Sequence, residues 1–192
     1  HDLRTPLTRM RMRLENATDP AARASIADIR EMDGMVASSL AVLREQRDGT
    51  PPGVIDLGAL LQAMVDDLAD EGQSVELAEM PPLRVRAHPA SLRRVVGNLV
   101  GNALRYGGNA RLHARAQDGR AVIAIEDDGP GIPPAQLDRV FEPWVRLQGG
   151  AQVGYGLGLA IARDLAERDG GTVALANRTE KGLRAEVTLP LA

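Results

Sequence analysis

Two asparagines and an arginine, Asn98, Asn102 and Arg105, fall on one arc of a helix expected over about residues 90–106. Side chains three and four positions apart share one face of an α-helix, and this face lies beside the apolar stripe of the helix. Amide oxygens are hard, neutral ligands that suit Mg²⁺, which completes its octahedron with waters and substrate phosphates. This face is a candidate metal and phosphate site, although a solvated helix surface also carries such pairs by chance.

A second candidate site is the segment from Asp127 to Gly131, which follows an expected strand. A carboxylate at the end of a strand can accept a hydrogen bond from an exocyclic amine such as that of adenine. Glycines at Gly129 and Gly131 would let a base approach the backbone closely. An acidic turn whose glycines supply positive φ explains the same residues equally well.

A third candidate is the glycine-rich run from Gly154 through Gly156 and Leu157 to Gly158, which opens another expected helix. Free backbone N–H groups and the helix dipole favour phosphate at such a position. The run lacks the Gly-Lys-Ser/Thr of a Walker loop. No strand leads directly into it, so it is not a Rossmann fingerprint either.

The first residues of the chain offer a nucleophile, His1, with Asp2 beside it and Thr5 four positions on. A neutral imidazole whose second nitrogen is held can attack a phosphoryl group. Asp2 could hold it only by leaning toward it, since neighbouring residues do not share a helix face. Thr5 does share that face and could position a water near a phosphoryl group on a partner protein. An exposed histidine on a helix usually has no special role, so this assignment depends on its context.

Two amphipathic helices, over about residues 1–17 and 20–46, are expected to carry His1. Two such helices cannot close a core alone, and pairing with a second copy would give a four-helix bundle. We therefore predict a homodimer through a phosphotransfer hairpin over residues 1–48, followed by a Gly- and Pro-rich linker at 49–53.

The remaining residues, 54–192, alternate between helical and strand patterns. Helices are expected near 57–71, 90–106 and 157–169, and strands near 74–77, 83–87, 110–117, 121–127, 172–177 and 184–190. The turn Asp118-Gly119 predicts a hairpin. Hairpins favour a mixed sheet with helices on one face over a doubly wound parallel fold. Residues 129–155, rich in Gly and Pro, are expected to form a mobile loop with one short helix. The predicted class is α+β, a helical hairpin followed by an α/β sandwich.

The composition of the chain argues against several classes of function. The net charge of −3 provides no basic field for nucleic acid, and the absence of cysteine removes thiol chemistry and disulfides. Apolar runs fall short of the roughly 20 residues of a membrane helix, so we expect a soluble, non-spanning chain. It opens on His1 without a start methionine or signal peptide, which is typical of a piece of a longer protein.

Taken together and in order, these motifs resemble those of the EnvZ-like sensor histidine kinases of two-component systems, over nearly the whole chain. The motifs are His1 to Arg9 as the H box, Asn98 to Asn102 with Arg105-Tyr106 as the N box, Asp127 to Gly131 as the G1 box, Phe141-Glu142-Pro143 as the F box and Gly154 to Gly158 as the G2 box. Trp144 stands where Phe is usual and Tyr155 where Thr is usual, and the glycine spacing is intact.

The resemblance implies a GHKL (Bergerat) fold that binds ATP with Mg²⁺ under a lid at about 129–155. It implies Mg²⁺ on Asn102, support from Asn98, adenine on Asp127, and Arg105 and Tyr106 beside the nucleotide. The glycine boxes complete the implied nucleotide site with Gly129, Gly131, Gly154, Gly156, Leu157 and Gly158.

The resemblance also implies a protein-histidine kinase that phosphorylates itself on His1, with Asp2 as base or orienter and Thr5 assisting dephosphorylation. The phosphoryl group would pass to an aspartate of a response regulator receiver domain. The chain would be the cytoplasmic portion of an inner-membrane sensor. Two alternatives are a gyrase- or chaperone-type ATPase, which would need a Glu in place of Asn98, and a nucleotide-sensing scaffold, which would be expected to lose the acceptor or metal residues.

Overall fold

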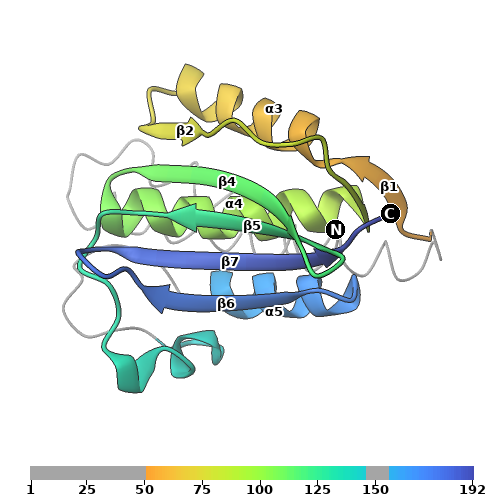
Figure 1. Cartoon of the computed structure of the whole chain (residues 1–192). Coiled ribbons are helices and arrows are strands. Elements are labelled where there is room, and N and C mark those ends of the chain that lie inside the picture. The colour runs from red at the N-terminus through yellow and green to blue at the C-terminus, as the bar shows by residue number, and fades with distance from the viewer. Residues whose placement is uncertain (1–50, 146–155) are drawn as a thin grey trace, which may run out of the picture. The chain divides into compact units, whose positions relative to one another are not determined.

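The computed structural model describes residues 51–145 and 156–192, which belong to one compact unit of the chain (Figure 1). The predicted hairpin with His1, Asp2 and Thr5 lies outside the described residues, as does Gly154. The boundaries predicted for the hairpin and linker therefore stay predictions. None of the helices in the described part combines the length and apolarity that crossing a bilayer requires.

A five-stranded mixed sheet forms the centre of the unit. Its strands, in spatial order, are β2 (Val75–Leu77), β4 (Ala110–Gln117), β5 (Arg120–Glu126), β7 (Leu183–Pro190) and β6 (Thr172–Asn177). Only β2 and β4 run parallel, and the other neighbours are antiparallel. The turn between β4 and β5 has φ of 49° at Asp118 and 74° at Gly119, the two positive values that a tight hairpin requires. The mixed sheet and its hairpin confirm the prediction.

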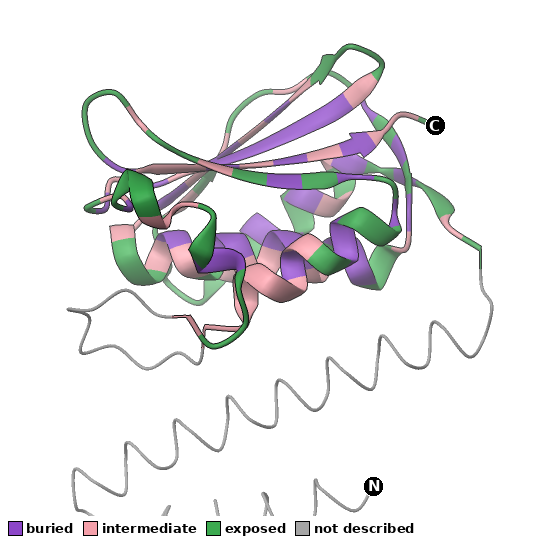
Figure 2. Ribbon diagram, turned by 90° about the horizontal axis from the view of Figure 1, so that it is seen from below, coloured by how far each residue is buried: buried purple, intermediate pink, exposed green. Residues whose placement is uncertain are grey.

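Two long helices pack against one face of this sheet, as predicted: α4 (Pro89–Gly107) and α5 (Gly158–Arg168) (Figures 1 and 2). The apolar stripe of α4 is buried and includes Leu92, Val96, Leu99 and Ala103. Alternate residues of the strands meet it, because successive side chains of a strand point to opposite faces. Those buried from the sheet include Leu112, Ile123, Ile125, Val187 and Leu189. Because α4 packs on the sheet through this core, the core also sets where the last turn of α4 lies relative to the end of β5.

A smaller antiparallel pair, β1 (Gly53–Asp56) with β3 (Arg84–Ala87), flanks the main sheet. An isolated bridge from Val85 to Leu191 connects the pair to the end of the chain. Helix α3 (Leu57–Asp70) follows β1, and its N-cap Asp56 accepts a hydrogen bond from the Ala59 amide at 3.1 Å. Such a cap satisfies a backbone donor that the first turn leaves free.

The segment after β5 differs from the expectation of one short helix. It contains two three-residue 3₁₀ turns, η1 (Pro134–Gln136) and η2 (Arg139–Phe141). Pro133 and Pro134 stand at the N-cap and the first position of η1, where a helix does not use the missing N–H groups. The chain becomes extended at Glu142, which precedes Pro143, because proline disfavours the helical conformation in the residue before it. Buried Phe141 holds η2 in place, with the guanidinium of Arg163 from α5 at 3.5 Å from its ring centre.

Candidate functional site

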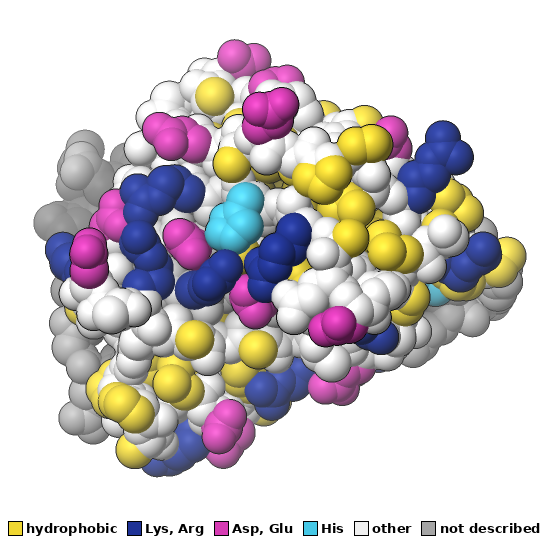
Figure 3. Space-filling model, in the orientation of Figure 1, with side chains coloured by type: hydrophobic (Ala, Val, Ile, Leu, Met, Phe, Trp, Pro, Cys, Tyr) yellow, Lys and Arg dark blue, Asp and Glu magenta, His cyan; other side chains and the backbone are white. Residues whose placement is uncertain are grey.

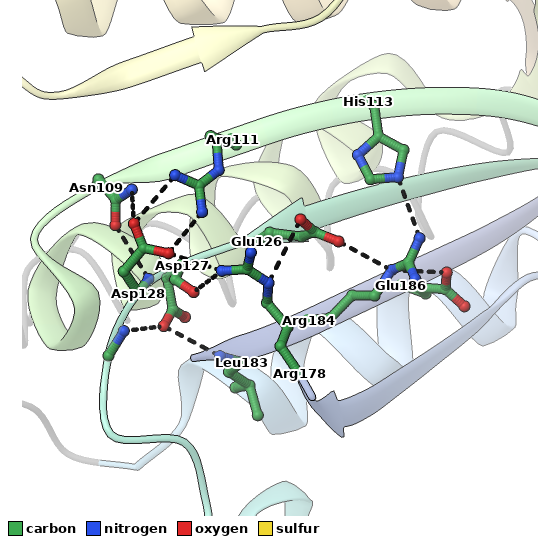
Figure 4. A network of polar contacts seen from close by, with 11 residues as sticks. Asn109, Arg111, His113, Glu126, Asp127, Asp128, Arg178, Leu183, Arg184 and Glu186 are labelled. Carbon is green, nitrogen blue, oxygen red and sulfur yellow. Dashed lines mark hydrogen bonds and ion pairs between the residues drawn. The ribbon is translucent and has the colours of Figure 1, made fainter. Parts of the chain in front are cut away.

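Asp127 follows directly on β5 and is only 6% exposed. Its Oδ1 accepts hydrogen bonds from the Gly129 amide at 2.8 Å and the Leu183 amide at 3.2 Å. Its own amide donates to the Leu183 carbonyl at 3.0 Å. Within the part of the chain that the structure describes, Oδ2 has no hydrogen-bond partner. The side chain is thus held by one oxygen, and the other is free to accept (Figure 4).

Burial raises the pKa of Asp127 above its ordinary value. The amides of Gly129 and Leu183 and the charge of Arg178 act in the opposite direction, while the charge of Asp128 adds to the rise. Hydrogen bonds to a carboxylate favour its ionised form, whereas burial disfavours it. The site therefore contains a desolvated acceptor, which discriminates strongly between donors and acceptors on a ligand.

Glycines let three segments approach Asp127 closely. A Cβ added to Gly107, at the end of α4, would lie 2.5 Å from the Asp127 Cβ. One added to Gly129 would lie 2.9 Å from Oδ1, and one added to Gly182 would overlap the Asp127 carbonyl. No side chain fits at these positions, so the end of α4 and the β6–β7 turn contact the aspartate through backbone. Gly131 has φ of 72° and packs against Asn177, whose side chain bonds both backbone groups of Ile132.

The paired asparagines lie one turn apart on α4, and both are half-buried. The Asn98 Nδ2 donates to the carbonyl of Gly158, the first residue of α5, at 3.0 Å. Asn102 makes no hydrogen bond to any described residue. The N-cap position of α5 is Leu157, which has no side-chain cap. The first turn of α5, with its free backbone N–H groups, therefore lies beside Asn98, one helical turn from the unengaged side chain of Asn102.

Backbone contacts also join the two sides of the predicted lid. The Trp144 amide donates to the Gly156 carbonyl at 3.1 Å. Gly156 has φ of 70°, and a Cβ there would clash with the Val145 carbonyl. Trp144 itself has φ of 70° and is 67% exposed. Residues 144–145 are thereby fixed beside the glycines that lead into α5.

Arg105 and Tyr106 occupy the last turn of α4, and both are exposed, Tyr106 by 54%. Helix α4 rises about 14 Å between Asn98 and Gly107, at 1.5 Å per residue. The helix thus connects the Asp127 end to the Asn98 and Gly158 end over a length comparable with that of an extended nucleoside triphosphate. Of the predicted nucleotide-site residues, Asn98, Asn102, Arg105 and Tyr106 lie on α4, Asp127 and Gly129 lie against its last turn, and Gly158 is bonded to Asn98, whereas Gly131 and Gly156 contact other segments.

Sequence reasoning missed the partners of Asp128. Its carboxylate is bonded by Asn109, Arg111 and Arg178, which lie 17 to 50 residues away along the chain. These contacts hold the pKa of Asp128 well below its usual range, with Arg111 as the main cause. Only the pairing of β4 with β5, which sets Arg111 opposite Glu126, and the β6–β7 connection could have indicated them.

The mixed sheet, the helices on one face and a buried aspartate at the end of the helix that carries the paired asparagines define an ATP-binding domain of the GHKL class. Residues 87–192 match the family described as histidine kinase-, DNA gyrase B- and HSP90-like ATPase. The chain belongs to this family, and within it the sequence and the fold are those of the histidine kinases.

Three relatives illustrate the match. Over 191 residues the chain is 39% identical to the sensor histidine kinase GtrS of Pseudomonas aeruginosa, covering 99% of the chain and 40% of GtrS. The crystal structure of the ATP-binding domain of PrrB from Mycobacterium tuberculosis is 30% identical with a TM-score of 0.63, covering 74% of this chain and 99% of that one. The histidine kinase domain of the Escherichia coli osmosensor EnvZ is 34% identical with a TM-score of 0.59, covering 74% and 91%. The chain spans less than half the length of GtrS.

Proposed function

We propose that this protein phosphorylates itself on His1 with MgATP and passes the phosphoryl group to an aspartate of a response regulator. The proposal that the site binds ATP is supported by the arrangement along α4. A free carboxylate oxygen of Asp127 lies at one end of this helix, and the start of α5, hydrogen-bonded to Asn98, lies at the other. Such a site positions a nucleotide and neutralises its charge, which is most of what phosphoryl transfer requires from a protein.

At the base end, Oδ2 of Asp127 would accept a hydrogen bond from the exocyclic amine of adenine. Gly129 and Gly131 leave room for the ring beside the backbone, and Arg105 and Tyr106 lie at the exposed edge. Guanine presents a carbonyl at the same ring position, which would face the carboxylate acceptor to acceptor. The site should therefore prefer ATP to GTP.

At the phosphate end, the free amides of the first turn of α5 would bind phosphate oxygens, with Gly154, Gly156 and Leu157 leading into them. The carboxamide oxygen of Asn102 would hold Mg²⁺, which fits because that side chain is bonded to no described residue. Mg²⁺ supplies charge neutralisation on the phosphates. Asn98 would keep the carbonyl of Gly158 turned away from the phosphates by bonding it.

In the transfer step, an imidazole nitrogen of His1 would form a bond to the γ-phosphorus while the bond to the bridging oxygen breaks and ADP leaves. Asp2 would take the imidazole proton or orient the ring. The phosphohistidine would then pass its phosphoryl group to the regulator's aspartate. Thr5 would position a water molecule for the later hydrolysis of that aspartyl phosphate. We further propose a homodimer through residues 1–48 and a place on the cytoplasmic side of a membrane sensor.

A labelling experiment tests the proposal. The 192-residue chain is incubated with γ-labelled MgATP, beside a His1→Gln variant as control. We expect label on the unmodified chain that is lost in acid and kept in base, and none on the variant. Acid-stable label would place the phosphate on a hydroxyl group. Phosphate release without any protein label would instead favour the gyrase- or chaperone-type ATPase.

A further inference from the structure

The carboxylate of Asp128 is held by three side chains that come from two distant parts of the chain. Asn109, between α4 and β4, donates to Oδ2 at 2.8 Å and accepts from the Asp128 amide at 3.1 Å. Arg111 on β4 donates to both carboxylate oxygens, at 3.0 and 2.6 Å. Arg178, after β6, donates to Oδ1 at 2.7 Å. These contacts leave the turn after β5 with little freedom to rotate (Figure 4).

Arg178 differs from the other two partners because it contacts three consecutive residues of the turn. Its Nη1 donates to the backbone carbonyl of Asp127 at 2.8 Å as well as to Asp128. Its Nε lies 3.6 Å from a carboxylate oxygen of Glu126. The side chain is 26% exposed, so these bonds are partly shielded from water. A planar guanidinium with five fixed donors can make such contacts together, and a lysine cannot.

We propose that Arg178 is a positioning residue for adenine recognition, because it fixes the peptide of Asp127 and thereby the direction of the free Oδ2. The proposal rests on the role of Asp127 given above. Because Oδ1 is bonded to the amides of Gly129 and Leu183, the side chain of Asp127 cannot turn freely, and Oδ2 moves mainly when the backbone rotates. Such a rotation would displace the carbonyl of Asp127. Arg178 bonds that carbonyl from the face of the sheet that α4 and α5 do not cover (Figure 4).

Other arginines on the same face allow a matched control. Figure 3 shows basic and acidic side chains interspersed around a histidine over this outer face of the sheet. Arg115 pairs there with Glu186 at 3.4 Å and is 41% exposed, and its side-chain bonds go to Gln117 and Glu186 and not to the Asp127 turn. Arg115→Gln therefore removes a comparable surface charge without touching the recognition turn.

The test compares ATP affinity, measured by calorimetry with Mg²⁺ present, in a set of variants of the full chain. We expect Arg178→Gln to weaken ATP binding about tenfold, the scale of one lost hydrogen bond to a charged group. Arg178→Lys should recover part of the loss, and Arg115→Gln should bind like the unmodified chain. Asp128→Asn removes the same anchor by a smaller change and should also weaken binding; it replaces Arg178→Gln if that variant does not fold.

A double-mutant cycle separates positioning from general stability. If Arg178 acts through Asp127, Arg178→Gln should cost little further affinity in an Asp127→Asn background. An equal loss in both backgrounds, or no loss in either, would overturn the positioning role while leaving Asp127 as the adenine reader. If Asp127→Asn itself leaves ATP affinity unchanged, the proposed nucleotide site fails and the positioning role with it.

Discussion

Replacing Asp127 by asparagine should separate recognition of adenine from the fold, because the two oxygens of this carboxylate do different work. The amide oxygen of asparagine can keep the bonds that Oδ1 accepts from Gly129 and Leu183, at 2.8 and 3.2 Å. The amide nitrogen then replaces Oδ2, so a donor faces the donating amine of adenine. A hydrogen bond to a charged group contributes roughly 1.5–3 kcal/mol. Its loss should weaken ATP binding by roughly 10- to 150-fold, at about 1.4 kcal/mol per tenfold.

The same change should leave stability at neutral pH unchanged or raise it. Burial raises the pKa of Asp127, which means that the folded state disfavours the ionised carboxylate relative to the unfolded chain. Such a group contributes stability that is fully present below its unfolded pKa and lost as the pH rises through its folded pKa. Asparagine carries no charge to desolvate, so the cost at neutral pH disappears.

Two measurements check the prediction: the dissociation constants for ATP and GTP, and the thermal midpoint without nucleotide. We expect the preference for ATP to shrink, since the new amide nitrogen can donate to the carbonyl of guanine. In the unmodified chain, ATP affinity should fall as the pH is lowered toward the raised pKa of Asp127. An unmodified chain that binds GTP as tightly as ATP would refute the reasoning, and so would an unchanged ATP affinity in a folded Asp127→Asn variant.

Three further predictions concern the remaining parts of the site. Asn102→Ala should abolish the Mg²⁺-dependent share of ATP affinity, measured as the difference between titrations with Mg²⁺ and with EDTA, and should not lower the thermal midpoint, since alanine favours the helix. Gly156→Ala should weaken ATP binding and cost about 1–2 kcal/mol of stability for a residue at positive φ, and Gly101→Ala, where an added methyl meets nothing within 4 Å, should not lower the free energy of unfolding. Thr5→Ala should spare autophosphorylation and slow dephosphorylation of a receiver domain that the unmodified chain phosphorylates; equal loss of both activities would mean that Thr5 supports the helix instead.

Local patterns predicted much of the fold. The apolar stripe of α4 and the turn at Asp118 and Gly119 depend on residues close in sequence, and the structure has both where they were expected. The prediction of one short helix after β5 differs from the structure, which has two 3₁₀ turns there, the second ending at Glu142 before Pro143. The parts of the lid that depend on Gly154 lie outside the described residues.

Contacts between distant residues could not be predicted in the same way. The register of β4, β5 and β7 places Arg111 and Arg184 on either side of Glu126, and no pattern within one strand indicates that register. The bond between Asn98 and Gly158 likewise depends on how α5 packs on α4. The sequence identified both residues as candidates for a phosphate site, but only the packing of the two helices shows that they meet.

The two neighbouring aspartates show how strand geometry assigns different roles to identical side chains. Successive residues at the end of β5 point to opposite faces of the sheet, so Asp127 faces the helices and Asp128 the outer surface. The buried carboxyl has a raised pKa and a free oxygen, while the outer one has a lowered pKa and three partners. A carboxylate whose oxygens are already bonded to two arginines has little capacity left for a base. The carboxylate with a free, desolvated oxygen is the one that can recognise it, and Asp128 instead holds the turn from which Asp127 acts.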